Sequence, residues 1–268
     1  MNAPQAALTR RTFVATGGAL IVSFAMSRSA LAQAAQQPVK LPGSLDKAPS
    51  LDSWIGIDGN GAVTVLTGKA ELGQGIMTAL IQCAAEELDV DPKVVTIVTA
   101  DTERTANEGY TAGSHSMQDS GTAILNAAAQ VRAILIELAA NQLNLPTDQL
   151  QAKTGAIVAN DGRSVAYKDL VIGQALHRTA QPQSPLKDPK SFTVIGKSTQ
   201  RVDIPGKVTG APMYVQDLRP EGMLHARVVR PPNYGAELVS VDVAAVEKLP
   251  GVIQVVRNGN FLAVAAQR

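Results

Sequence analysis

The sequence predicts an α+β protein made of two modules with mixed sheets. Short β-branched runs such as Val63–Thr67 are bounded by glycine, asparagine and aspartate, which is typical of strands and their turns. Two longer segments, one after Gly75 and one after Thr122, carry apolar residues at helical spacing. A run with three prolines, at residues 179–189, separates the two modules.

A glycine-rich loop, GKAELGQG, connects the strand expected at Val63–Thr67 to the first long helix. The helix is expected to open at Gly73-Gln74-Gly75. Its apolar face repeats at helical spacing and consists of Ile76, Leu80, Ile81, Ala84 and Leu88.

A second loop, rich in small and hydroxyl residues, runs from Thr111 to Thr122 and precedes the longest expected helix. One face of this helix is apolar and consists of Ile124, Leu125, Ala128, Val131, Leu135 and Leu138.

The remaining elements follow from turn residues between short apolar runs. The turns Asp58-Gly59-Asn60-Gly61 and Asn160-Asp161-Gly162 predict two hairpins. Strands are expected at residues 53–57, 94–99, 155–158, 164–166, 223–229, 252–256 and 261–265, and short helices at 167–170 and 243–248.

Both loops have the chemistry of a ligand site. Glycine allows a backbone to approach a flat or charged ligand closely, and a helix N-terminus offers N–H groups to anions. A glutamine amide both donates to and accepts from the edge of a heterocycle. Two such loops in one module therefore predict a large polar cofactor that carries phosphate.

Several motifs together resemble a known family. GKAELGQGIMTAL, EELDV, the DT pair at 101–102 and GYTAGSHSMQDSGTAILNAAAQVR are similar to the molybdopterin-binding large subunit of the xanthine dehydrogenase/aldehyde oxidase family, in its isoquinoline 1-oxidoreductase beta-subunit-like branch. GKSTQRVDIPGKVTGAPMYVQDLRPEGMLHARVVRPPNYGAELVSVD resembles the α/β-hammerhead domain of that family. The resemblance begins near Leu51 and implies a mixed-sheet molybdopterin-binding domain followed by a hammerhead domain.

The resemblance implies part of an exported molybdenum hydroxylase that oxidises an N-heterocycle or an aldehyde, with water as the oxygen source. The implied cofactor is molybdenum-molybdopterin, with the cytosine dinucleotide as one of its forms. The implied partners are an iron–sulfur small subunit, the C-terminal part of the large subunit and a cytochrome electron acceptor. In this family the C-terminal part carries the glutamate that acts as base beside molybdenum, so no catalytic residue and no metal ligand is expected in this chain.

The resemblance also assigns cofactor contacts to both loops. Residues of the first loop would hold the pterin, and residues of the second its phosphate-bearing side: Gly73, Gln74 and Gly75, and Ser114, Ser116, Ser120 and Thr122, respectively. From the residues alone, Gln74 could equally close a tight turn. Ser120 is also a candidate N-cap, a role that is compatible with a phosphate contact.

Other polar residues receive no functional role. His115 is expected to be a solvated loop residue, and no pair of histidines has metal-ligand spacing. Glu86 and Glu87 are expected on a solvated helix face. Cys83 is the single cysteine, which excludes an internal disulfide and an iron–sulfur cluster held by this chain, and it is expected to be a buried structural thiol.

Composition gives no reason to expect a nucleic-acid partner. The 268 residues carry a formal net charge of +1 with scattered signs, and aromatic residues make up only 3%, so surfaces for stacking on bases are scarce. The chain is long enough for two modest cores.

The N-terminus has the features of a twin-arginine signal peptide. Arg10 and Arg11 precede a short apolar run, and Ala30-Leu31-Ala32 gives a cleavage site. A periplasmic protein is therefore expected, exported folded around its cofactor. The expected divisions are a signal peptide at 1–32, a linker at 33–50, the first part of the molybdopterin-binding domain at 51–178, a linker at 179–190 and a hammerhead domain at 191–268.

The C-terminal end predicts a truncated or split subunit. The last apolar run, from Phe261, reads as a strand that enters a core, and no cap or polar tail follows it. A chain of this kind is expected to be inactive without the remaining part of the large subunit.

Two alternatives remain open at this stage. The chain could be a non-catalytic exported fragment that only docks a partner subunit. It could also be a nucleotide-binding domain, because a strand, GQG, a helix, a second strand and Asp101 follow one another. Against the second alternative, six residues separate the first strand from Gln74, and Thr78 stands where a third glycine is required.

Overall fold

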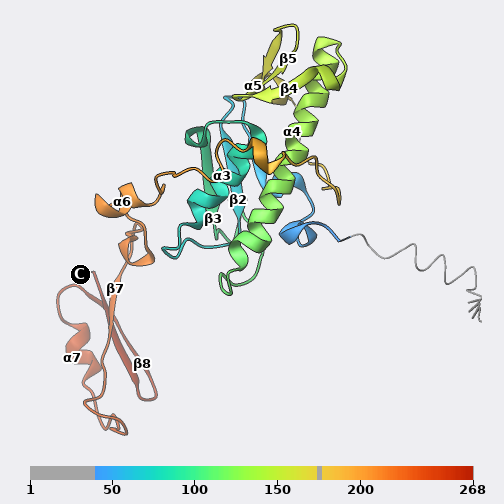
Figure 1. Ribbon diagram of the computed structural model, residues 1–268. Helices are drawn as coiled ribbons and strands as arrows, with labels where there is room; N and C mark the ends of the chain where they lie inside the picture. The colour runs from blue at the N-terminus through green and yellow to red at the C-terminus, as the bar shows by residue number, and fades with distance from the viewer. Residues whose placement is uncertain (1–39, 174–176, 268) are drawn as a thin grey trace, which may run out of the picture. The chain divides into compact units, whose positions relative to one another are not determined.

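The computed structural model describes residues 40–173 and 177–267 (Figure 1). The chain divides into two compact units, with the boundary between Gln200 and Arg201. The expected signal peptide at 1–32 lies outside the described residues and stays a prediction.

The first unit contains a three-stranded mixed sheet, as the sequence predicts. Strand β1 (Ile55–Ile57) pairs antiparallel with β2 (Val63–Thr67), which pairs parallel with β3 (Val95–Thr99). The β1–β2 hairpin turns where expected, and Asp58 Oδ1 fixes the turn by accepting the N–H groups of Asn60 and Ala62, both at 2.9 Å. The parallel pair is joined through helix α3 (Ile76–Leu88), so β2, α3 and β3 form a βαβ unit.

Helix α3 and helix α4 (Thr122–Leu143) pack against each other, α3 over β2 and β3 and α4 against β1 (Figure 1). The expected apolar face of α3 is buried throughout, and that of α4 is buried except at Leu125 and Leu138, which are partly buried. Each large apolar side chain buried in this way contributes about 1.5–3 kcal/mol relative to an exposed one.

Helix α4 is preceded by a turn of π-helix at Ser116–Gly121 that the sequence does not predict. Residues 116–143 together are long and apolar enough to span a membrane by length and composition, but 67% of the most apolar window is buried inside the protein. That burial is the pattern of a core helix, so this feature alone is weak support for a membrane span.

A second sheet of three antiparallel strands packs beside α4. It consists of β4 (Leu150–Lys153), β5 (Ala156–Ala159) and β6 (Ser164–Ala166), and the short helix α5 (Tyr167–Val171) follows. The hairpin β5–β6 and helix α5 are confirmed. Strand β4, with the sequence LQAK, is not predicted by the sequence, because it has no β-branched residue.

Residues 40–50 pack against the first unit, although they fall in the expected linker at 33–50. The 3-10 helix Gly43–Asp46 contacts α4, and the Leu45 side chain is fully buried. The indole N–H of Trp54 donates to the backbone oxygen of Ala48 at 2.8 Å. The linker interpretation is therefore wrong for this stretch, because Leu45 supplies an apolar anchor to the core.

The C-terminal half of α3 carries buried acids, so the expectation of a solvated acidic face is wrong. Glu86 and Glu87 are both 0% exposed. One carboxylate oxygen of Glu86 accepts the backbone N–H groups of residues 193–195 at 2.6–2.9 Å. The second oxygen lies 3.8 Å from the Lys187 ammonium.

Glu87 forms an ion pair with Arg132 of α4 and accepts the backbone N–H of Lys187 at 3.1 Å. The Arg132 guanidinium also donates to the backbone oxygens of Glu87 and Pro185. These bonds hold residues 185–195 on α3 and α4. The stretch expected as a linker at 179–190 is thus packed onto the first unit.

Cys83 lies one helical turn before Glu87 and is buried, as expected. Burial, together with the nearby Glu87 carboxylate, raises the pKa of the Cys83 thiol to about 12. The thiol is therefore neutral near pH 7, which fits a structural residue and not a nucleophile.

The second unit is an α+β assembly with a three-stranded antiparallel sheet of order β7-β9-β8. Its elements are α6 (Ile204–Val208), β7 (His225–Val228), α7 (Val243–Glu247), β8 (Val252–Asn258) and β9 (Phe261–Ala266). The expected strands and the helix near 243–248 are confirmed. Hydrogen bonds from Arg201 and Lys207 hold the pKa of Asp203 well below its usual range and close the turn around α6. The hammerhead identity of this unit stays a prediction.

Candidate functional site

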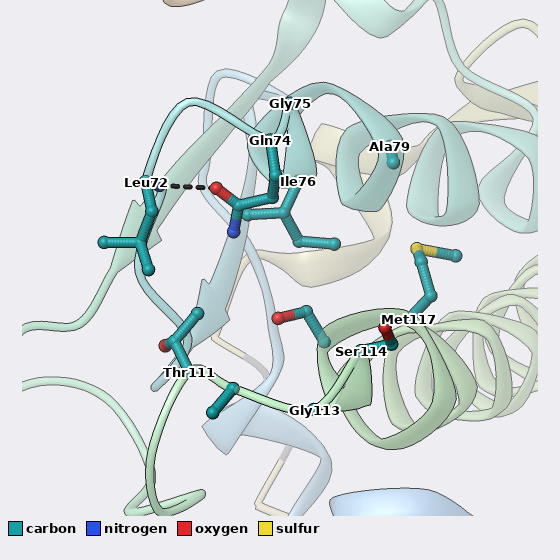
Figure 2. A pocket seen from close by; sticks show the side chains of 11 residues that line it. Leu72, Gln74, Gly75, Ile76, Ala79, Thr111, Gly113, Ser114 and Met117 are labelled. Atoms are coloured by element: carbon teal, nitrogen blue, oxygen red, sulfur yellow. Dashed lines mark hydrogen bonds between the residues drawn. The ribbon is translucent and has the colours of Figure 1, made fainter.

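The two loops singled out in the sequence meet at a pocket of about 510 Å³ in the first unit (Figure 2). One wall comes from the loop before α3 and the first turns of that helix, and the other comes from residues 111–117. The lining consists of Leu72, Gln74, Gly75, Ile76, Ala79, Thr111, Ala112, Gly113, Ser114, Ser116 and Met117.

The pocket lining combines apolar side chains from both walls with hydroxyl groups from the second wall. Ile76 and Met117 point into the hollow from opposite walls (Figure 2). Thr111, Ser114 and Ser116 supply hydroxyl groups from the second wall. Among the residues that the structure describes, no ionisable side chain belongs to this lining.

The loop before α3 is closed by its own side chains. The Gln74 amide accepts the Leu72 N–H at 2.5 Å and donates to the Ala70 oxygen at 2.8 Å. The turn interpretation of Gln74 is therefore confirmed, and its position on the pocket wall leaves a ligand contact compatible with that role. The loop needs glycine at two points, since Gly73 and Gly75 have φ values of 98° and 85°.

A carboxylate lies at the N-terminus of α3. Glu71 Oε1 accepts the N–H groups of Gly73 and Gly75 at 2.8 and 2.9 Å, and Oε2 accepts the Met77 N–H at 3.1 Å. A helix N-terminus can bind a ligand anion, but here the protein's own carboxylate occupies that position. An acidic residue shortly before a helix start is the signal that could have revealed it.

The two loops are joined by a second, buried carboxylate. Glu108 is 2% exposed, and it accepts the Thr67 hydroxyl at 2.7 Å, the Gly68 N–H at 2.7 Å and the Ser120 hydroxyl at 2.5 Å. The Lys69 ammonium, also 2% exposed, donates to the backbone oxygen of Glu108 at 3.0 Å. Through these hydrogen bonds, Glu108 links the end of β2 to the π-helix. Sequence reasoning missed them, because no local pattern marks a buried acid whose partners are distant.

The second loop has an unusual backbone where it enters the pocket. Gly113 and Ser114 both have φ of 62°, a conformation that is uncommon for serine. Thr111 Oγ1 accepts the Ala70 N–H at 2.8 Å, which ties this loop directly to the first one. His115 lies within 3.3 Å of Asp119 and is half exposed, as a solvated loop residue would be.

The structure brings together four of the seven residues assigned to cofactor contacts: Gln74, Gly75, Ser114 and Ser116 line the pocket. Gly73 belongs to the same loop but is not part of the lining. The other two lie elsewhere. Ser120 is fully buried and its hydroxyl donates to the Glu108 carboxylate. It caps no helix, so the expected N-cap role is wrong, and its contact with a cofactor stays a prediction.

Thr122 lies outside the pocket lining, in the first turn of α4. A Cβ atom added to Gly43 would lie 2.9 Å from the Cβ of Thr122. Thr122 therefore lies beside residues 40–50. The π-helix rotates this part of the helix relative to a regular α-helix, which the periodicity of the sequence cannot reveal.

No group of three or more histidine, cysteine, aspartate or glutamate side chains is placed to hold a metal ion within residues 40–173 and 177–267. The lining suits an organic ring system with a polar tail, since apolar side chains and hydroxyl groups line the same hollow.

The molybdopterin cofactor-binding domain family matches residues 9–245 of the chain. The chain belongs to this family. It is a molybdopterin-binding subunit of the xanthine dehydrogenase family, related to oxidoreductase subunits of molybdenum hydroxylases.

Three relatives show the extent of the match. Over 83% of its length, the chain is 37% identical to a nicotinate dehydrogenase subunit of Pseudomonas putida, of which it covers 19%. Over 93%, it is 31% identical to the membrane-bound aldehyde dehydrogenase (pyrroloquinoline-quinone) of Gluconacetobacter polyoxogenes, of which it covers 33%. Over 97%, it is 28% identical to the beta subunit of isoquinoline 1-oxidoreductase of Brevundimonas diminuta, of which it covers 38%. The chain thus spans less than two fifths of the length of each of these relatives.

Proposed function

We propose that the chain holds the molybdenum cofactor of a periplasmic molybdenum hydroxylase that oxidises an N-heterocycle or an aldehyde, with water as the oxygen source. The observation that carries this proposal is the pocket, at which two loops distant in sequence meet and whose lining, in the described part of the chain, includes no ionisable side chain. A site of this kind binds and encloses a reactive group that it does not itself supply.

The pocket residues divide into two roles. Gln74 and Gly75 would hold the pterin ring, and Ser114 and Ser116 would contact the phosphate-bearing side. Hydroxyl groups accept and donate hydrogen bonds without adding charge, so they suit either the phosphate or its dinucleotide extension. Ile76 and its apolar neighbours would exclude water from the ring.

When bound, the molybdenum cofactor supplies the redox chemistry. This chain positions it: Glu108 and Lys69 hold the two loops in register, so that both walls face one ligand. Because the lining residues that the structure describes offer no proton donor or acceptor of suitable pKa, proton transfer from the substrate belongs to another segment of polypeptide.

The complete enzyme would need further polypeptide. The relatives named above are subunits or much longer chains, which supports assembly with a further part of the large subunit and with an iron–sulfur subunit. A cytochrome would accept the electrons. We expect residues 1–268 alone to show no turnover.

A nucleotide-binding domain is the weaker candidate. Eight residues, 68–75, separate β2 from α3, whereas a dinucleotide loop turns at once from strand to helix. The anion position at the α3 N-terminus is also taken by Glu71.

Export is a separate part of the proposal. Replacing Arg10 and Arg11 with lysine should leave the precursor in the cytoplasm, because the twin-arginine pair would be lost. Fractionation of cells followed by immunoblotting measures this. An unchanged periplasmic level would refute the signal assignment.

The proposal is tested by the molybdenum and the pterin that stay bound to the purified protein. The wild-type chain, expressed in cells that make molybdopterin together with the remaining subunits, should carry both. The variant Ala79→Trp, in which an indole fills the pocket, should carry neither.

A further inference from the structure

The N-terminus of α3 is already occupied by an anion of this chain. Glu71 accepts hydrogen bonds from Gly73, Gly75 and Met77 with both carboxylate oxygens, at 2.8–3.1 Å. The N–H groups of Gly75 and Met77 belong to the set that a helix N-terminus leaves without intrahelical partners, and the N–H of Gly73 comes from the loop before it. The carboxylate therefore occupies the position at which a ligand phosphate or carboxylate would otherwise bind.

We infer that Glu71 is an internal anion that positions the loop before α3 and excludes ligand anions from this helix end. The inference rests on the proposed function in one respect: it places the phosphate of the cofactor on the opposite wall, at Ser114 and Ser116. Glu71 itself is a positioning residue, because it acts on the ligand through the backbone of residues 73–77.

The loop conformation explains why a side chain can fill the position. Gly73 and Gly75 both have positive φ, so the chain turns twice and directs their N–H groups toward the same point. Glu71 precedes this turn by two residues and is long enough to reach Met77 as well. Its bonds are charge-assisted, and such bonds are stronger than bonds between neutral groups.

A second anion cannot share this position. A ligand phosphate there would lie beside the Glu71 carboxylate, and two like charges on the same few N–H groups repel each other. Gln74 already uses one of its two amide N–H groups on the Ala70 oxygen, and its own amide oxygen accepts the Leu72 N–H, so both bonds hold the amide within the loop.

The inference predicts that removing the carboxylate creates an anion site. In Glu71→Ala the N–H groups of Gly73, Gly75 and Met77 lose their acceptors, and a space of the size of the missing carboxylate remains. Formate has the same two oxygens and no further substituent, so it should enter and restore the bonds. Inorganic phosphate should compete for the same site.

The experiment is a titration of the 15N-labelled full chain with sodium formate, and separately with inorganic phosphate, at constant ionic strength. In Glu71→Ala we expect saturable chemical-shift changes at the amides of Gly73, Gly75 and Met77. The wild-type protein and the exposed control Glu103→Ala should show none. No saturable change in Glu71→Ala, or the same change in the wild type, would overturn the inference.

A second variant covers the case in which Glu71→Ala does not fold. Glu71→Gln keeps one acceptor oxygen but places an NH2 group at the other position. The Met77 amide should then exchange with solvent faster, by roughly tenfold for the loss of one hydrogen bond, while the amides of Gly73 and Gly75 change less. Equal exchange at all three amides in Glu71→Gln and in the wild type would contradict the inference. Neither experiment requires a bound cofactor, so a negative result is distinct from a failure of the proposed function, which pterin content measures.

Discussion

Replacing Glu108 with alanine is expected to lower the free energy of unfolding by about 3–5 kcal/mol, because three polar groups would lose the carboxylate that accepts their hydrogen bonds. The fully buried Thr67 and Ser120 hydroxyls and the partly buried Gly68 N–H would lose their acceptor. Each buried polar group left without a partner typically costs about 1–3 kcal/mol.

The measurement is urea unfolding followed by tryptophan fluorescence. Trp54 is the single tryptophan and is fully buried in the first unit, so its emission reports the unit that contains Glu108. The matched control is Glu103→Ala, an exposed acid nearby, for which a change within about 0.5 kcal/mol is expected. A loss below about 1 kcal/mol for Glu108→Ala would contradict the role assigned to Glu108.

Replacing Arg132 with alanine is expected to cost a similar amount, about 3–5 kcal/mol, because the Glu87 carboxylate would remain buried without its counter-charge. The backbone oxygens of Glu87 and Pro185 would also lose their donor. A second consequence is specific to this site: residues 185–190 should come away from α3 and α4.

Two measurements distinguish this result from general destabilisation. Urea unfolding gives the free energy, and limited proteolysis under native conditions should cut Arg132→Ala near Lys187 or Lys190 faster than the wild type. The control is Arg163→Ala, whose ion pair with Asp161 is about half exposed and is expected to contribute no more than about 1 kcal/mol. If Arg132→Ala matched this control in both stability and cleavage, the ion pair would not hold the segment.

The local elements of the fold could be predicted from the sequence. Hairpin turns at Asp58 and Asn160, the β-branched strands and the apolar faces of both helices depend on neighbours within a few residues. Strand β4 and the π-helix were missed, because neither has a distinctive pattern of side chains.

The polar interior could not be predicted, because its partners lie far apart in the chain. A pair of glutamates on a helix ordinarily faces solvent. The carboxylates of Glu86 and Glu87 instead accept hydrogen bonds from donors that lie 45 to 109 residues away in the sequence. Ser120 shows the same limit. The position of Ser120 before α4 favours an N-cap, but its hydroxyl donates to the buried carboxylate of Glu108, 12 residues earlier.

The candidate site was predicted in part for a similar reason. The glycine and hydroxyl composition of the two loops pointed to four residues of the pocket lining. It could not reveal that Glu71 already fills the anion position of the first loop, since the same residues would suit an external phosphate equally well.

The central claim, that the pocket between the two loops holds a molybdopterin, is tested most directly by the pterin and molybdenum bound to Ala79→Trp and Ala133→Trp. Both alanines lie on helices and line a pocket, but Ala133 lines a different one, between α4 and residues 178–185. Each variant receives the same bulky side chain, and thermal unfolding followed by circular dichroism verifies that both fold. We expect the wild type and Ala133→Trp to retain pterin and molybdenum after purification and Ala79→Trp to retain neither. Equal pterin content in the two folded variants, a quinone in place of the pterin, or no cofactor in the wild type would contradict the account.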